Sequence, residues 1–482
     1  MQDNQDVFAW SHSDMVGIDP NVISHVLNID PNYPPRQQKR RPLDDERKKA
    51  LKEEVDRLVE NKFIRDAYYP TWIANPVLVP KPNGKWRTCI DYSDLNKACP
   101  KDCFPLPRID QLVDATAGHE TMSFMDAYSG YNQIAMHPPD QEHTSFVTDK
   151  GLYFYNVMPF GLKNTGATYQ RLVNRMIASQ IRVNMEVYVD DMLVKSKCQK
   201  NHIQDLTECF AILRKYNMKL NPQKCSFGVS SGKFLGFIVN ARGIEANPDK
   251  IRALIDMPSP KKHKDVQSLT GRMAALSRFI SKSTDKCVPF FNLLRGNKKF
   301  EWTEECEAAF QAIKRHMATP PILSKPETGE SLILYLATTE HAISSVLVRE
   351  DGRQQRPVYY VSKRLLGAES RYPSMEKLAL SLVHASRKLR PYFQAHPIKV
   401  YTDQPLRQVL AKPETSGRLL KWAVELGQFE ITYHPRTTIK GQALADFIVE
   451  CTGVEELPDE NAPKDAWQLY VDGSATANAS GA

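Results

Sequence analysis

The sequence predicts an α+β protein of several domains, and three observations support this. The chain has 482 residues, which is enough for two to four domains with separate cores. Helical and strand-like segments alternate in the first half and again between about residues 300 and 450. The segment 246–299 between these units is mostly helical and basic, which is typical of a connector.

The composition excludes few classes of partner, but it does indicate the environment in which the protein is found. The 64 Lys and Arg residues exceed the 56 Asp and Glu residues by eight, which permits a phosphate-rich partner without requiring one. Nine cysteines, an odd number without C-x-x-C pairs near histidines, indicate reduced thiols and no structural zinc. The N-terminus lacks a signal pattern, and no apolar run reaches about 18 residues. We therefore expect a soluble protein.

Residues 1–43 are polar and contain scattered prolines, so they are expected to form an extended N-terminal arm. The cluster Lys39, Arg40 and Arg41 near its end could be a weak nuclear signal or a phosphate contact, but a solvated linker is favoured.

A helix and a hairpin are expected next. The helix begins near Asp44, and its apolar residues recur on one face: Leu51, Val55, Leu58 and Val59. The stretch NPVLVPKPNGKWRTCIDY predicts two strands joined by a Pro-Asn-Gly turn, with three basic residues at or beside the tip: Lys81, Lys85 and Arg87.

Two adjacent aspartates interrupt the apolar stretch MEVYVDDMLVKS at residues 185–196. Asp190 and Asp191 fall where a tight hairpin turn would join two buried strands. Adjacent carboxylates repel and lose hydration against buried strands, so a bound cation would compensate, and Mg²⁺ prefers such oxygen ligands. The alternative is a solvated acidic turn.

A third carboxylate closes an earlier apolar strand, in MSFMDAYSGYNQIAM. An enzyme that transfers nucleotides with two metal ions needs two or three carboxylates from different strands, and Asp126, Asp190 and Asp191 supply that set. Taken alone, Asp126 would more commonly be an ordinary residue at a strand end.

These residues belong to a series of blocks that resembles a known family over nearly all of the chain. The chain resembles the pol polyprotein of Ty3/gypsy-type long-terminal-repeat retrotransposons, most of all plant elements. The matching blocks occur in the family's order: VPKPNGKWRTCIDYSDLNK, FPLPRID, SFMDAYSGYNQI, VMPFGLKNTGATYQ, YVDD, KLNPQKCSFG and KFLGFIV. The resemblance implies a reverse transcriptase at 44–245, with a right-hand fingers, palm and thumb core at about 61–240. A helical connection or thumb at 246–299 and an α/β RNase H-like domain at 300–450 follow.

The resemblance also implies roles for individual residues. Asp126 and Asp190 would hold two Mg²⁺ ions, with Mn²⁺ as a substitute, and Asp191 would be a third, weaker ligand. Lys81 and Arg87 would grip the incoming triphosphate.

The remaining implied roles concern the nucleotide and the primer. Tyr131 would exclude a ribose 2′-OH, and Phe160 would lie under the nucleotide, although some relatives have Gln there. Each of these rings, taken singly, would otherwise be an ordinary core aromatic. Lys224 would be a general acid for pyrophosphate. The primer grip would comprise Phe234, Leu235 and Gly236.

The RNase H-like unit departs from the family pattern. That nuclease needs four carboxylates around two metal ions, and Glu376, Asp403 and Asp446 match three of them. Ala337 stands where the metal-bridging aspartate belongs, and Glu340 is too far along the chain to replace it. We therefore expect a degenerate domain that acts as a tether.

The end of the chain offers a reason for this loss. After a linker at 451–466, residues 467–482 resemble the truncated start of a second RNase H domain, in which Asp472 follows the expected strand. The alternative for this tail is a disordered end.

The sequence thus favours an RNA-directed DNA polymerase that acts on an RNA template, a DNA primer, their RNA–DNA hybrid and dNTPs. Two rivals are a non-catalytic nucleic-acid-binding remnant and a reverse transcriptase with a working RNase H. Protease, zinc-knuckle and integrase signatures are absent, which indicates a piece of a longer polyprotein. The expected location is the cytoplasm, in virus-like particles, with nuclear entry and no membrane contact. The sequence does not indicate an oligomeric state.

Overall fold

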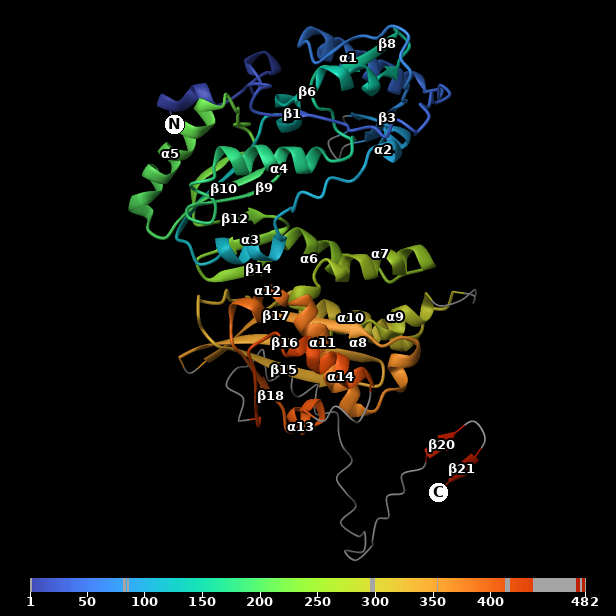
Figure 1. Cartoon of the computed structure of the whole chain (residues 1–482), viewed down its shortest axis with the longest axis vertical. Coiled ribbons are helices and arrows are strands. Elements are labelled where there is room, and N and C mark those ends of the chain that lie inside the picture. Colours follow the sequence, from blue (N-terminus) through green and yellow to red (C-terminus); the bar gives the residue numbers. More distant parts are fainter. Residues whose placement is uncertain are drawn as a thin grey trace, which may run out of the picture.

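A computed structural model describes residues 2–80, 84, 86–294, 300–352, 354–411, 417–436, 474–476 and 479–481. In Figure 1 the first half of the chain, blue to green, forms one end of the molecule, and the orange residues form the other. Helices of the connecting segment lie between them. The α+β multidomain architecture predicted from the sequence is confirmed.

The first long helix, α1 (Asp45–Glu60), begins at Asp44, whose carboxylate accepts a hydrogen bond from the backbone N–H of Arg47. It buries Leu51, Val55 and Leu58. Val59 is 44% exposed, so its assignment to the buried face was wrong. It follows Leu58 directly, and one residue along a helix rotates the side chain by about 100° away from the core.

The predicted hairpin is present as β3 (Pro76–Pro80) paired antiparallel with β4 (Trp86–Ile90). Lys81 and Lys85 lie outside the described residues. A three-stranded sheet beside it has the order β2-β8-β7. Its strands are β2 (Ile64–Asp66), β7 (Phe146–Val147) and β8 (Leu152–Tyr155).

The central sheet of the first half has the strand order β11-β5-β10-β9, and all its neighbours are antiparallel. Its strands are β5 (Thr121–Asp126), β9 (Met185–Tyr188), β10 (Asp191–Ser196) and β11 (Ser226–Val229). Helices α3 (Ile109–Thr116) and α4 (Thr165–Met176) contact β9, whereas α5 (His202–Lys215) contacts β10. This sheet positions the carboxylates discussed below.

The block KFLGFIV forms a hairpin, with a tight turn at Leu235 and Gly236, which both have positive φ. The turn joins β12 (Ser231–Phe234) to β13 (Phe237–Asn240), and β14 (Gly243–Ala246) completes the small sheet. The connecting segment is helical, as predicted, and leads to α10. Its main helices are α6 (Pro248–Ile255), α7 (His263–Ala274) and α9 (Val288–Leu293), and α10 spans Glu304–Ala318.

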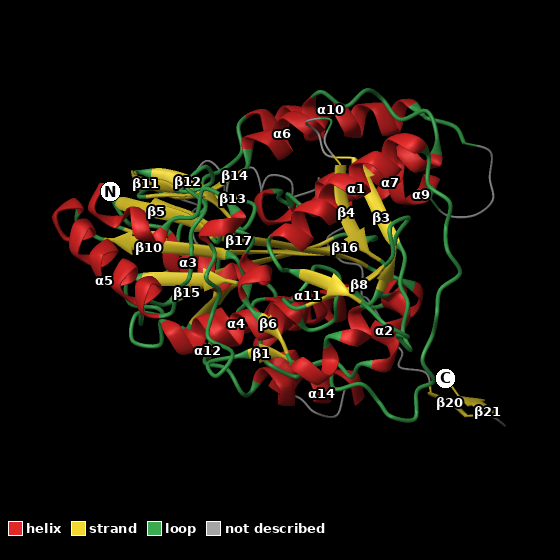
Figure 2. Ribbon diagram, turned by 90° about the horizontal axis from the view of Figure 1, so that it is seen from above, coloured by secondary structure: helices red, strands yellow, loops and turns green. Residues whose placement is uncertain are grey.

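A five-stranded sheet forms the second half, in the order β17-β16-β15-β18-β19, as Figure 2 shows in part. The first three strands are antiparallel, and β15, β18 and β19 are parallel. The elements are β15 (Leu332–Thr338), β16 (Ala342–Asp351), β17 (Gln354–Arg364), α11 (Ser374–Lys388), α12 (Arg390–Ala395), β18 (Ile398–Tyr401), α13 (Leu406–Ala411), α14 (Gly417–Leu426) and β19 (Ile431–His434). The alternating strand-like and helical segments that the sequence predicts between about residues 300 and 450 are therefore present.

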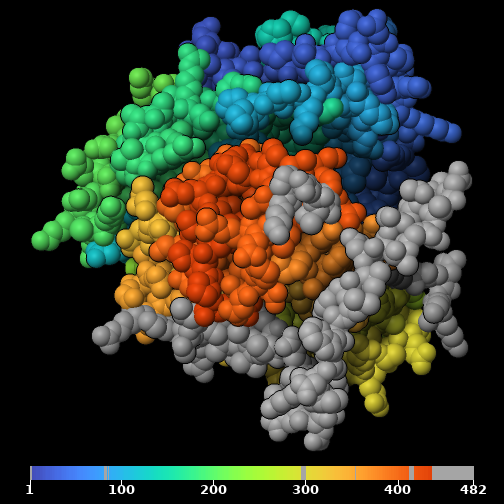
Figure 3. Space-filling view, turned by 60° about the horizontal axis from the view of Figure 1, so that its bottom comes forward, coloured from blue at the N-terminus to red at the C-terminus, as the bar shows by residue number. Residues whose placement is uncertain are grey.

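Strand β15 is buried on both faces, and its successive side chains pack alternately in two different hydrophobic cores. Leu332, Leu334 and Leu336 pack in one core with residues of α11. Ile333 and Tyr335 join a second core that also contains residues of the central sheet and the connecting helices. Figure 3 shows the orange surface lying directly against the cyan and green surface. The second half is therefore continuous with the first through a shared core.

Shorter elements complete the described chain. They are η1 (Gln2–Val7), η2 (His12–Asp14), β1 (Ser24–His25), α2 (Ser93–Ala98), η3 (Gly130–Gln133), β6 (Ala135–Met136), η4 (Pro138–Asp140), η5 (Glu142–Thr144), η6 (Gln199–Asn201), η7 (Ser277–Phe279), α8 (Ser283–Lys286), η8 (Gly367–Arg371), β20 (Ser474–Thr476) and β21 (Ala479–Gly481). No helix of the described ranges is long and apolar enough to cross a membrane. The eight cysteines in these ranges are free thiols.

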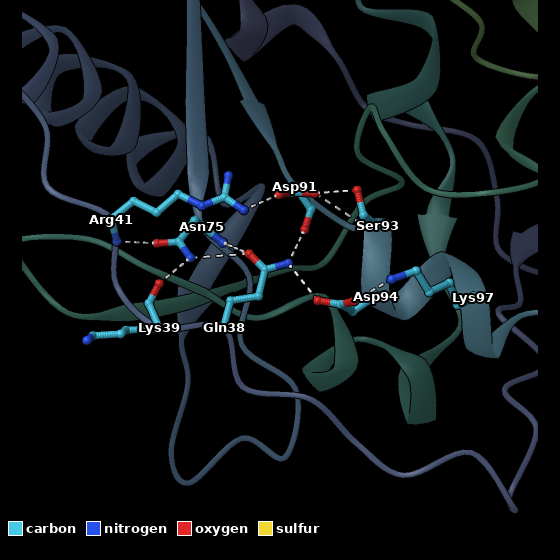
Figure 4. A network of polar contacts seen from close by, with 8 residues as sticks. All are labelled: Gln38, Lys39, Arg41, Asn75, Asp91, Ser93, Asp94 and Lys97. Atoms are coloured by element: carbon cyan, nitrogen blue, oxygen red, sulfur yellow. Dashed lines mark hydrogen bonds and ion pairs between the residues drawn. The ribbon is translucent and has the colours of Figure 1, made fainter.

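The N-terminal arm is fastened to the hairpin β3–β4 near its end, as Figure 4 shows. The Asn75 side chain accepts a hydrogen bond from the backbone N–H of Arg41 at 3.0 Å, and the Arg41 guanidinium pairs with Asp91 at 2.7 Å. Gln38 accepts from the backbone N–H of Asn75 and donates to the backbone carbonyl of Asp91. The Lys39 side chain points away from this network. The basic cluster thus has exposed side chains on a backbone that is fixed in place.

Arg278 joins the two halves of the molecule, and its side chain is only 4% exposed. Its guanidinium contacts two carboxylates of α3, Asp114 at 2.6 Å and Asp110 at 3.3 Å. From the second half, the Tyr392 hydroxyl bonds Asp114, and the Tyr359 ring lies 4.6 Å from the guanidinium. A buried charge is tolerated when it is paired in this way, and removal of one partner is strongly destabilising. This cluster therefore fixes the RNase H-like unit against α3.

Candidate active site

A strained turn carries the two adjacent aspartates between β9 and β10. Val189 has a φ of 52°, a left-handed conformation that β-branched residues rarely adopt. Its backbone N–H donates a 2.8 Å hydrogen bond to the side chain of Gln170, a residue of α4 that is 1% exposed. The buried amide therefore holds the turn in a conformation that the local sequence would not favour.

Strand pairing brings the third carboxylate to this turn. Asp191 begins β10 and lies directly opposite Asp126, the last residue of β5. Asp190 occupies the turn itself. The fold therefore gathers Asp126, Asp190 and Asp191 at one end of the central sheet.

The electrostatics of the gathered carboxylates favour a cation. Burial, and then the charges of Asp126 and Asp191, raise the pKa of Asp190 to about 7. Burial and Asp126 also raise the pKa of Asp191. The Oδ1 atom of Asp190 is buried and has no hydrogen-bond partner within the described chain. An unpaired acceptor of this kind suits a metal ligand.

Lys224 provides the nearest positive charge in this arrangement. Its Nζ lies 3.1 and 3.3 Å from the two carboxylate oxygens of Asp126. Across the described residues, no three Asp, Glu, His or Cys side chains are already grouped as a metal site. Binding two cations at the aspartates would therefore require Asp126 to release Lys224.

Gly130 allows the loop after Asp126 to approach the turn. A Cβ atom at this position would lie 2.5 Å from Oδ1 of Asp190, closer than real Cβ contacts. The loop can therefore pack against the carboxylate only because residue 130 is a glycine.

A pocket of about 630 Å³ opens over the carboxylates. Asp126, Asp190 and Lys224 line one part of it, and Arg87 of β4 and Phe160 line another. The pocket therefore combines metal-type ligands with cationic and aromatic groups, the chemistry needed to hold a nucleoside triphosphate.

The two aromatic residues that the sequence assigned to the nucleotide lie together. The rings of Tyr131 and Phe160 are 4.7 Å apart, and Tyr169 packs 5.8 Å from Tyr131. Phe160 is 51% exposed, so it is no core aromatic. Burial, and then the charge of Asp190, raise the pKa of Tyr131.

The expected primer-grip residues form the tip of the hairpin β12–β13. Phe234 is 2% exposed and packs 6.4 Å from Phe124 of β5, whereas Leu235 and Gly236 form the turn. The hairpin is thus attached to the strand that carries Asp126.

In the second half, arginines pair with the two described carboxylates of the expected nuclease site. Arg418 contacts Glu376 at 2.9 Å. The backbone N–H of Arg436 donates to Asp403 at 3.1 Å, and its guanidinium lies 3.9 Å from the same carboxylate. That guanidinium also donates to the backbone carbonyl of Leu336, next to Ala337. Cationic side chains thus lie where metal ions would be expected.

Ala337 itself is 6% exposed within β15, where it faces the shared core. Asp446 and Asp472 lie outside the described residues.

Sequence reasoning missed several residues of these sites. Gln170 supports the turn, Arg436 bonds the backbone carbonyl of Leu336, and the N-terminal residues Trp10 and His12 line the main pocket. Each is far along the chain from its partners, and no local motif marks it.

Two family models match the chain. The model "Reverse transcriptase (RNA-dependent DNA polymerase)" matches residues 79–239, and "RNase H-like domain found in reverse transcriptase" matches residues 302–400. The first range contains the three aspartates, Tyr131 and Phe160.

Curated relatives include transposon polyproteins of animals and fungi. The Pol polyproteins from Drosophila melanogaster transposons 297 and opus are each 30% identical, over 86% and 88% of this chain. The Tf2-3 polyprotein of Schizosaccharomyces pombe is 28% identical over 84%. The matches cover 39%, 44% and 30% of these relatives, so the chain spans less than half of their length.

Solved structures of foamy viral protease-reverse transcriptase share the fold. One, described as a complex with RNA/DNA hybrid, has a TM-score of 0.81 at 19% identity, over 96% of this chain and 62% of that one. Another, described as a complex with dsDNA, has a TM-score of 0.74 at 21% identity, over 84% of this chain and 86% of that one.

Proposed function

We propose that this chain, a Ty3/gypsy-like retrotransposon Pol region with a reverse transcriptase domain and an RNase H-like domain, polymerises DNA on an RNA template. The observation that carries the proposal is the convergence of Asp126, Asp190 and Asp191 at one end of the central sheet, where Asp126 and Asp190 line the pocket. The domain boundaries 44–245, 246–299 and 300–450 are part of the proposal.

The residues present fit two divalent cations. Reverse transcriptases use divalent metal ions, and here we propose Mg²⁺, with Mn²⁺ as a substitute. The fit rests on the carboxylates and on the unpartnered Oδ1 of Asp190. When bound, the ions would activate the 3′-hydroxyl and neutralise the phosphates. Asp126 and Asp190 would hold both ions, and Asp191 would be the weaker ligand.

The other residues would bind and orient the reactants. Arg87, with Lys81, would grip the triphosphate, because a guanidinium matches phosphate oxygens in a bidentate fashion. Phe160 would support the base or sugar. Lys224, once released from Asp126, would give a proton to pyrophosphate. The hairpin tip at 234–236 would hold the primer end.

The partners would be RNA template, DNA primer, their hybrid and dNTPs, which the fold shared with hybrid-bound foamy viral enzymes supports. Extension of a labelled DNA primer on an RNA template, compared with a DNA template and with no template, tests the proposal. A non-catalytic nucleic-acid-binding remnant would retain the hybrid in a gel shift and extend nothing.

Sugar selection gives a specific prediction. Tyr131→Val should improve ribonucleotide incorporation relative to deoxynucleotides by about ten- to a hundredfold, because the ring would no longer exclude the 2′-hydroxyl. The ratio of rNTP to dNTP incorporation measures this. Tyr68→Val, at a tyrosine that is 76% exposed, serves as the matched control. An unchanged ratio in Tyr131→Val would disprove the role.

We propose that the RNase H-like domain does not cleave RNA and serves as a structural tether. Ala337 supplies no ligand, and Arg418 and Arg436 lie beside Glu376 and Asp403. The expected linker at 451–466 and, within the expected RNase H start at 467–482, residues 467–473 with Asp472 lie outside the described residues, so they add no support.

The nuclease prediction is tested with a labelled RNA–DNA hybrid in Mg²⁺ or Mn²⁺. We expect no RNA fragments above the level that Glu376→Gln gives. Ala337→Asp should not restore cleavage, because the arginines still occupy the other carboxylates. Clear cleavage by the wild-type chain that disappears in Glu376→Gln would show that the domain is a nuclease.

The origin and location of the element are further parts of the proposal. We assign it to the plant-type elements and place it in the cytoplasm, within virus-like particles, with nuclear entry. A nuclear-signal role for the exposed side chains of Lys39, Arg40 and Arg41 is the alternative to the favoured solvated linker. Localisation of a fluorescent fusion with these three residues replaced by Ala tests this role.

A further inference from the structure

The first residues of the chain are built into the wall of the polymerase pocket. The backbone of Leu220 donates to Val7 at 2.9 Å and accepts from Ala9 at 3.0 Å. The segment that contains Leu220 also pairs with the loop after Asp126, because the backbone N–H of Tyr128 donates to the carbonyl of Lys219 at 2.9 Å. The N-terminal segment, defined here as residues 6–12, is thus linked to the loop after Asp126 through the backbone of Lys219 and Leu220.

Side chains anchor this segment firmly. Val7 and Ala9 are 1% and 0% exposed. Phe8 packs between Phe210 and Phe227, with ring centroids 6.1 and 5.9 Å away. The carboxylate of Asp6 accepts a 2.8 Å hydrogen bond from Arg214. The segment therefore holds a defined position on the central sheet.

His12 uses this position to reach the loop after Asp126. Its two ring nitrogens lie 3.4 Å from the Tyr128 hydroxyl and 3.3 Å from the Ser129 hydroxyl. Its ring also packs edge-on against Phe63 at 5.6 Å. Ser129 has a φ of 45°, a conformation that a non-glycine residue keeps only when its surroundings hold it. His12 supplies that support.

The residues at the two ends of the loop after Asp126 relate this loop to nucleotide binding. It begins at Asp126, a proposed metal ligand, passes Gly130 against Asp190, and ends at Tyr131, the proposed sugar-facing ring. In a bound dNTP the triphosphate joins the metal ions to the sugar. The loop therefore borders the triphosphate, and its position controls how the nucleotide is held.

Trp10 and His12 also face the pocket directly, together with Arg57 of α1. Trp10 is 70% exposed although its neighbour Ala9 is fully buried. Its backbone N–H and that of Ser11 donate to the Asp14 carboxylate at 2.8 and 2.9 Å, which fixes the chain at this point. An exposed indole on a fixed backbone, in a pocket that a guanidinium also lines, can form a wall suited to a nucleotide.

We propose that the N-terminal segment is a positioning element of the polymerase site, in which His12 sets the loop 128–130 for the incoming dNTP and Trp10 forms the adjacent wall. This inference rests on the proposed function. Because His12 acts through Tyr128 and Ser129, its loss should affect nucleotide affinity more than the chemical step.

The test measures nucleotide binding without catalysis. The full chain is bound to an RNA template and a dideoxy-terminated DNA primer, and dGTP is titrated opposite a template cytosine with Ca²⁺. The tryptophan fluorescence change should be lost in Trp10→Phe. We expect His12→Ala to weaken dGTP binding about tenfold, and with extendable primer to raise KM similarly while kcat changes less than about twofold.

Control variants separate positioning from packing. His12→Phe keeps the ring but not its hydrogen bonds and should behave like His12→Ala, whereas His12→Gln should recover part of the affinity. His341→Ala, at an exposed histidine of the second half, should match the wild type. Equal dGTP affinity in wild type and His12→Ala would overturn the role of His12, and no Trp10-dependent signal would overturn the wall. Nucleotide binding without incorporation by the wild type would instead refute only the polymerase activity.

Discussion

Replacement of Asp190 by Asn is expected to abolish primer extension, by about a thousandfold or more, while the fold remains intact. The substitution keeps the shape of the side chain and removes one charge from a site that gathers three carboxylates from β5, β10 and the turn. An amide oxygen is a much weaker metal ligand than a carboxylate, so both cations would be lost or misplaced.

The same substitution is expected to stabilise the metal-free protein. Burial, with the charges of Asp126 and Asp191, raises the pKa of Asp190 from 3.8 to about 7, so folding disfavours its ionised form. The wild type therefore loses stability as the pH rises from about 4 to about 7, and Asp190→Asn does not incur that loss. Its advantage should be largest above pH 7 and vanish below pH 4. The buried carboxylate that the proposed reaction needs thus lowers the stability of the metal-free protein, as is common at active sites.

Thermal melting in EDTA at pH 8 and at pH 4, with primer extension in parallel, measures both effects. Asp256→Asn removes an exposed carboxylate at the end of α6 and should change neither result. Near wild-type extension by Asp190→Asn would show that this aspartate is not a metal ligand.

Arg278→Ala is expected to destabilise the protein by about 3–5 kcal/mol. The guanidinium pairs with Asp114, which is 15% exposed, and with Asp110. Removing it would leave the Asp114 carboxylate without its cationic partner. It would also remove the contacts of Arg278 with Tyr359 and Tyr392 of the second half. The loss should therefore loosen the RNase H-like unit from α3.

Urea unfolding and limited proteolysis at the connection measure this effect. Arg278→Lys keeps the charge without the forked geometry and should fall between the wild type and Arg278→Ala. Arg242→Ala breaks an ion pair of a side chain that is 73% exposed, and should cost less than about 1 kcal/mol. Equal effects of Arg278→Ala and Arg242→Ala would mean that the Arg278 cluster contributes little.

Local patterns in the sequence predicted most of the secondary structure. The apolar runs around the aspartate pair predicted β9 and β10. The hairpin at KFLGFIV was not anticipated, because a mainly apolar run with one glycine gives little sign of a turn. Val59 was wrongly placed on the same helix face as Leu51, Val55 and Leu58, because only its spacing along the chain indicates which face it occupies.

Contacts between distant segments could not be predicted. The N-terminal arm was expected only to be extended, yet residues 7–9 pair with Leu220. Arg278 was part of a basic connector, although its partners lie on α3 and on α12. The candidate aspartates were found because a family motif marks them, whereas Gln170 and His12 support them from positions that carry no motif.

We propose that three aspartates make this chain a metal-dependent polymerase that copies RNA. The most direct measurement is incorporation of a single dNTP opposite an RNA template base by the wild-type chain, as Mg²⁺ is titrated and then removed with EDTA. We expect a primer longer by one nucleotide, whose formation rises with Mg²⁺ and stops with EDTA. A chain that binds the hybrid but adds no nucleotide at any Mg²⁺ or Mn²⁺ concentration would contradict it.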